Sequence, residues 1–235
     1  MGAAFSDITI YAQSLFAEGT AEFAKDGALK NYISDLYTQK MNGYKPPGIT
    51  RITIHPGYHG DWNRTWKRGS IVAIAPYFNA EEYTVSDKMG KYRSILDLIQ
   101  VSTLQLSEEY QWDKTVFENA YQEIIRANYE FIKEYPVKMS RDKKKYARVQ
   151  VEKTETTTRL NLIFTINGIE KKVQLFEKRN WYWYNSVYEL AKHSKWLDKH
   201  TFGVYSKQSD RFGYYSLLDD VIIGKLDFNK NDFPE

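Results

Sequence analysis

The chain has 235 residues, with 33 Lys and Arg against 30 Asp and Glu, 19 Tyr, 12 Phe, 6 Trp and no Cys. This composition indicates a folded globular protein and excludes a disordered chain, a disulfide scaffold, a thiolate metal site and a Cys nucleophile. No segment approaches the roughly 20 apolar residues of a membrane-spanning helix, and no signal peptide is recognisable, so we expect a cytoplasmic protein that does not bind membranes.

The N-terminal part predicts two helices followed by two strands. Apolar residues recur at helical spacing over 4–16 and again over 29–37, where Asp26 suits the N-cap. Residues 49–54 alternate and are rich in β-branched side chains, and 70–78 are almost all apolar, so both predict strands. The polar and aromatic segment between these strands is longer than most loops, and long loops are often functional.

The middle of the chain predicts two more helices. The apolar spacing of the first lies over 95–106, and Ser86 or Asp87 marks its expected start. Residues 99–106 also fit an alternating strand. The second is the clearest in the chain. Its apolar stripe runs from Val116 to Ile132, with Asp113 as the N-cap and Pro136 as the end.

The last part predicts a β-meander with strands over 147–153, 159–166 and 171–176, and Asn167-Gly168 is a strong hairpin signal. A capping box at Ser186 predicts a helix over 187–200, before short strands. The expected fold is α+β, with N-terminal helices, a long central amphipathic helix packed on an antiparallel sheet, and a C-terminal β-meander. We expect a single domain, 1–235, with a possible sub-boundary near 138–146.

A few residues suggest chemistry. His55, His59 and Asp61 lie close together in the loop 55–68 and have the side chains of a metal site or an acid–base pair. A metal-dependent hydrolase is therefore one alternative, although Pro56-Gly57 excludes the helical spacing of known zinc motifs. Phosphate-binding loops and the serine-hydrolase elbow are absent. No cofactor is expected, and the balance leans away from an enzyme.

Exposed aromatic and charged residues suggest binding instead, because Trp, Tyr and Arg dominate interface hot spots. The candidate partner-binding residues are Trp62, Arg64, Trp66, Lys178, Arg179, Trp181, Trp183, Tyr214 and Tyr215. A second alternative is nucleic-acid binding by the basic and aromatic block 138–184, since residues 138–200 carry 15 Lys and Arg against 7 Asp and Glu.

A small Cys-free chain, rich in Tyr and Trp, with uneven charge and no catalytic signature, resembles the toxin-neutralising immunity proteins of bacteria. That resemblance implies a non-enzymatic protein that binds a partner toxin or enzyme and covers its active surface. Charge complementarity would then speed the encounter between the two proteins.

Overall fold

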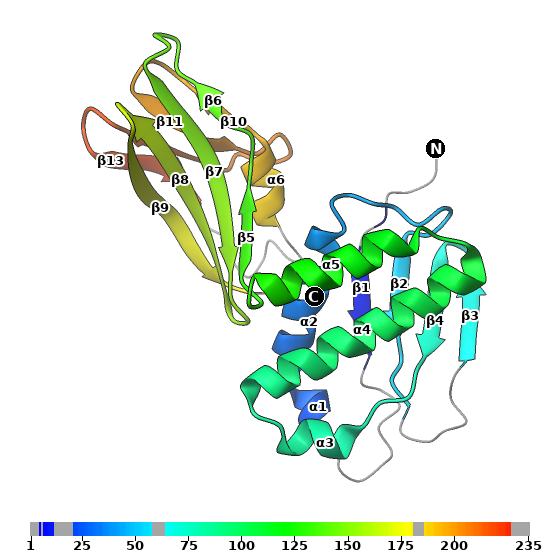
Figure 1. Cartoon of the computed structure of the whole chain (residues 1–235). Coiled ribbons are helices and arrows are strands. Elements are labelled where there is room, and N and C mark those ends of the chain that lie inside the picture. Colours follow the sequence, from blue (N-terminus) through cyan, green and yellow to red (C-terminus); the bar gives the residue numbers. More distant parts are fainter. Residues whose placement is uncertain (1–4, 6, 12–20, 58–63, 181–185, 227–235) are drawn as a thin grey trace. The chain divides into compact units, whose positions relative to one another are not determined.

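The computed structural model describes residues 5, 7–11, 21–57, 64–180 and 186–226. The chain divides into two units, Met1–Glu130 and Phe131–Glu235 (Figure 1). Helices occur together with antiparallel sheets, which confirms the predicted α+β class. The possible sub-boundary near 138–146 lies inside the second unit, whereas the division between the units follows Glu130. None of the described helices combines the length and the apolar composition needed to cross a membrane.

The first unit contains a four-stranded mixed sheet with the order β1-β2-β4-β3. Strands β1 (Asp7–Ile10), β2 (Arg51–Ile54) and β4 (Ile71–Ala75) run parallel, whereas β3 (Arg64–Arg68) is antiparallel to β4 and forms one edge. The helices of this unit are α1 (Ala21–Lys25), α2 (Gly27–Lys40), α3 (Ala80–Val85), α4 (Lys88–Tyr110) and α5 (Lys114–Arg126).

The buried hydroxyl of Tyr37 joins the three long helices. From α2 it donates to Oε1 of Gln100 at 2.6 Å and lies 3.0 Å from Oγ1 of Thr103, both on α4. It also lies 3.2 Å from the carbonyl oxygen of Phe117 on α5. Burial raises the pKa of Tyr37 well above its usual range. The phenol therefore stays protonated and acts as a structural hydrogen-bond donor.

Three predicted helices and their caps can be compared with these elements. The helices over 29–37 and 95–106 are confirmed as parts of α2 and α4. Asp87, and not Ser86, caps α4, since its Oδ1 accepts from the Gly90 N–H at 2.7 Å. Asp113 caps α5 as predicted. Asp26 occupies the N-cap position of α2, but its side chain accepts no capping hydrogen bond. The local patterns thus located these helices, and side-chain caps are present at α4 and α5.

Three predicted helical segments are wrong in part. The described residues of 4–16 include β1, because β-branched Ile8, Thr9 and Ile10 pair with β2 instead of forming helical turns. Helix α5 ends at Arg126 rather than at Pro136, since the left-handed φ angles of Asn128 (48°) and Tyr129 (60°) end the helix. The helix over 187–200 stops at Lys192 and is followed by a strand.

The described residues of the second unit form two antiparallel sheets and one helix. One sheet has the order β5-β7-β8-β9, with β6 also paired to β7, and the other has the order β10-β11-β12-β13. The strands of the first sheet are β5 (Phe131–Glu134), β6 (Lys138–Met139), β7 (Lys145–Lys153), β8 (Thr157–Ile166) and β9 (Ile169–Arg179). The remaining elements are α6 (Ser186–Lys192), β10 (Ser194–Trp196), β11 (Thr201–Tyr205), β12 (Phe212–Ser216) and β13 (Val221–Lys225).

Both sheets and α6 contribute to one core in the second unit. Its buried members include Val149, Leu162 and Phe164 from the first sheet, Leu190 from α6 and Phe202 from the second sheet. The predicted meander is confirmed as β7, β8 and β9, and the Asn167-Gly168 turn has positive φ at both residues (53° and 80°). This is the geometry expected of a tight two-residue hairpin turn.

Candidate functional site

An aromatic row lies where the parallel strands of the first unit end. Tyr11 follows β1 and His55 follows β2, and their rings stack with centres 5.1 Å apart and an interplanar angle of 13°. The ring of His55 also lies 5.2 Å from that of Trp66 on β3. In parallel sheets, the carboxyl ends of the strands are a common position for binding sites. This row is therefore the first candidate site.

The edge strand β3 presents its side chains to two sides. Thr65 donates to Oε2 of Glu109 at 2.7 Å, and Nζ of Lys67 lies 5.8 Å from the ring centre of Tyr110, so both face α4. Trp66 points to the other side, against His55. Side chains alternate along a strand, so Arg64 and Arg68 share the side of Trp66.

We call these five residues the arginine–tryptophan face: Tyr11, His55, Arg64, Trp66 and Arg68. The side chains of Arg64 and Arg68 are exposed, and neither forms an ion pair with a described residue. Trp66 is 46% exposed although one edge of it packs on His55. The face thus combines a partly held indole with two arginines that are available to carboxylates or phosphates.

His55 contributes to this face by ring stacking and is less suited to act as a general base. Burial lowers its pKa, so the imidazole is neutral at neutral pH. Its backbone N–H donates to the carbonyl of Ile74 at 2.8 Å, which fixes the residue against β4. Among the described residues, no carboxylate bonds the imidazole, and no group of three or more His, Asp or Glu is placed to hold a metal ion.

Five of the predicted site residues, His59, Asp61, Trp62, Trp181 and Trp183, lie outside the described residues. The rest fall in both units. Arg64 and Trp66 belong to β3 in the first unit, whereas Lys178 and Arg179 end β9 in the second. Tyr214 and Tyr215 on β12 are 8% and 4% exposed, so they belong to the buried interior of the second unit and not to its surface. Sequence reasoning did not bring Arg68 into the site, because β3 lacks the apolar alternation by which strands are recognised. It did not bring in Tyr11 because 4–16 was expected to be a helix, whereas Tyr11 follows strand β1.

Lys178 lies in a cationic environment. It is opposite Thr158 on β8, and Lys153 is opposite the same residue on β7. Directly opposite residues share a face of the sheet, so the two lysines flank Thr158. Burial first, and then the positive charges of Lys153 and Arg211, lower the pKa of Lys178 to about 8. Lys178 is therefore a half-buried member of a cluster, whereas Arg179 next to it is exposed.

Several cations of the basic block 138–184 are engaged in intramolecular ion pairs. Arg148 pairs with Glu134 and Glu170, at 3.1 Å and 2.8 Å. Lys171 and Lys172 also have carboxylate partners. Three cations remain exposed in the turn between β6 and β7, namely Arg141, Lys143 and Lys144. Such pairing reduces the positive field that a nucleic-acid site would need.

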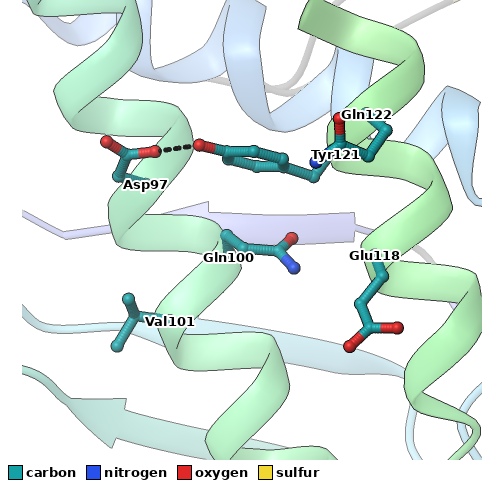
Figure 2. Close-up of a pocket in the computed structure, with 6 residues that line it drawn as sticks. All are labelled: Asp97, Gln100, Val101, Glu118, Tyr121 and Gln122. Atoms are coloured by element: carbon teal, nitrogen blue, oxygen red, sulfur yellow. Dashed lines mark hydrogen bonds between the residues drawn. The ribbon is translucent and has the colours of Figure 1, made fainter.

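A shallow hollow lies between α4 and α5 and has a volume of about 450 Å³. Figure 2 shows the residues that line it: Asp97, Gln100, Val101, Glu118, Tyr121 and Gln122. Asp97 already accepts from the Tyr121 hydroxyl at 2.5 Å and pairs with Arg93 at 3.0 Å. Its carboxylate is therefore committed within the unit, and the arginine–tryptophan face remains the stronger candidate.

No protein-family model, no curated protein and no solved structure matches the chain.

Proposed function

We propose that this is a non-enzymatic binding protein that grips an acidic protein partner with the arginine–tryptophan face. The observation that carries the proposal is the position of Trp66. Its indole is 46% exposed, yet it packs on His55 between Arg64 and Arg68. Trp and Arg are the residues most enriched at interface hot spots.

The face suits a protein surface for energetic reasons. Strand β3 and the ring of His55, which is itself stacked on Tyr11, hold Trp66, so little side-chain entropy is lost when a partner covers it. The two arginines flank the indole, and each guanidinium can form paired hydrogen bonds with a carboxylate. An acidic partner surface would be attracted at long range and then held by the buried indole.

The form of binding that we favour is neutralisation. The partner would be a toxin or enzyme whose active surface is acidic, and the bound face would cover that surface. A cytoplasmic location agrees with a chain that has no Cys, because the cytoplasm keeps thiols reduced and disulfides are rare there.

The proposal is tested by recovering the partner from the native host and measuring its affinity. Trp66→Ala should weaken binding by about 2 kcal/mol or more, which is about 30-fold in Kd. Arg64→Glu combined with Arg68→Glu should weaken it further and slow association. The matched control is Tyr146→Ala, since Tyr146 is a similarly exposed aromatic residue (44%) on β7 in the second unit. Thermal unfolding of each variant shows whether the fold is intact.

The alternatives predict other outcomes. A metal-dependent hydrolase built on His55, His59 and Asp61 would be purified with a metal ion that is lost in His55→Ala. A nucleic-acid-binding protein would be recovered with RNA or DNA, and its affinity would fall steeply with salt. A partner that binds wild type and Trp66→Ala equally well would refute the proposed face.

A further inference from the structure

Strand β13 exposes apolar side chains on both of its sides. All five residues are exposed, and Val221, Ile222 and Ile223 are 45%, 47% and 51% exposed. Leu218, in the turn before β13, is 72% exposed. Three consecutive exposed aliphatic residues on a short strand form an apolar patch with an unusual composition for a protein surface.

Among the described strands, β13 is also an edge, because it pairs only with β12. Exposed edges usually carry charges that prevent pairing with other chains. Two of the other edge strands follow this rule clearly. Strand β3 carries Arg64, Lys67 and Arg68, and β9 has charged residues at more than half of its positions. Strand β13 has a single charged residue, Lys225, at its end.

We propose that β13 pairs with β13 of a second copy of the chain, antiparallel and about a two-fold axis. A two-fold contact requires a strand that is complementary to itself. With the axis at Ile223, the small Gly224 of each copy lies opposite Ile222 of the other. Each Lys225 lies opposite Val221 of the other copy, at the end of the strand that follows the acidic turn of that copy.

The charges near the ends of β13 support pairing with a second copy of the same strand. Asp219 lies just before β13, beside Asp220, which pairs with Lys171, and Lys225 ends the strand. Antiparallel copies therefore bring the acidic end of one beside the basic end of the other. Within its own copy, the side chain of Asp219 accepts from the hydroxyl of Ser216 and is bonded to no other residue that the structure describes, and Asp219 is exposed. The Lys225–Asp210 pair is also on the surface and leaves the ammonium accessible. A parallel arrangement would instead place like charges together.

Pairing would extend one sheet through both copies and cover the aliphatic residues at the junction. A contact of one short strand is at the low end of interface sizes, so the dimer is weak and depends on concentration. This inference uses only the second unit and does not depend on the arginine–tryptophan face.

The first test is sedimentation of the full chain over a concentration series. Wild type should pass from monomer to dimer. Ile223→Lys should raise the dimer Kd at least about tenfold, because it places two like charges opposite each other at the axis. The control is Ile169→Lys, which changes an even more exposed isoleucine (73%) at the start of β9 and should leave the dimer unchanged. A chain that stays monomeric, or a dimer that Ile223→Lys does not weaken, overturns the proposal.

The second test uses the absence of Cys from the chain. In Ile223→Cys the two thiols meet at the axis, so mild oxidation should link the copies. Val85→Cys places a more exposed thiol (85%) on α3 and should not cross-link at the same concentration. Equal cross-linking of both variants would indicate random collision and would count against the β13 contact, even if Ile223→Lys folds too poorly to be measured.

Discussion

At the scale of single residues, Lys30 shows how burial changes a charge. It lies on α2, is 4% exposed, and its Nζ donates to the carbonyl oxygen of Phe23 at 2.6 Å. The same ammonium lies 4.3 Å from the centre of the Phe23 ring. Burial lowers the pKa of Lys30 to about 8, and the negative charge of Asp26 offsets only part of this effect.

This lowered pKa predicts a pH dependence of stability. A lysine of the unfolded chain titrates near pH 10.4, so between about pH 8 and 10.4 the unfolded state binds more protons. The free energy of unfolding therefore rises with pH across this window, and the destabilisation is complete below about pH 8. Lys30→Met should flatten the rise by up to about 1.4 kcal/mol per pH unit, as measured by urea denaturation from pH 7 to pH 10.

The matched control is Lys143→Met, because Lys143 lies exposed in the turn between β6 and β7. It should leave the pH profile of wild type unchanged. If Lys30→Met keeps the wild-type slope, Lys30 is hydrated in solution and its burial does not govern its titration.

At the scale of elements, local patterns were enough for the starts of the long helices, for strands β2 and β4 and for the central hairpin, but not for β1 and β3. The apolar spacing on α4 and α5 and the Asn167-Gly168 turn are local signals. Residues 7–10 form strand β1 because they pair with β2, and the sequence of these four residues alone does not indicate that pairing. The candidate site shows the same contrast between local signals and contacts that depend on the sheet. Trp66 was identified by residue type, whereas its contact with His55 depends on strand order in the sheet.

Two glycines allow the same substitution to be compared in two environments. Gly168 has a φ of 80° and open space around its Cα, so Gly168→Ala costs only backbone strain, about 1 kcal/mol. At Gly203, on β11, a Cβ would lie 2.0 Å from the carbonyl oxygen of Gly213 on the neighbouring strand. Gly203→Ala should therefore separate β11 from β12 and lower stability by several times as much.

The measurement is urea denaturation of both variants beside wild type, with the secondary structure followed by circular dichroism. Equal losses of stability in the two variants would show that β11 and β12 can move apart at little cost. The comparison would then remove the steric explanation for glycine at position 203.

At the scale of the whole molecule, charge is divided between the two units. Residues 1–130 carry 13 Lys and Arg against 16 Asp and Glu, whereas 131–235 carry 20 against 14. The arginine–tryptophan face is therefore a local basic patch on a unit that is acidic as a whole. Such a patch orients an approaching acidic partner more specifically than a uniformly basic surface would.

Each unit also contains a set of fully buried aromatic residues, and this predicts two separable cores. Phe117 on α5 and Phe164 on β8 are both 0% exposed. Replacing either with Ala should cost about 3–5 kcal/mol within its own unit, because a large cavity remains. Hydrogen exchange resolved along the chain should then show faster exchange over 21–126 in Phe117→Ala and over 131–225 in Phe164→Ala. If each variant instead exposes both regions equally, the two units unfold as one cooperative domain, as the sequence alone had led us to expect.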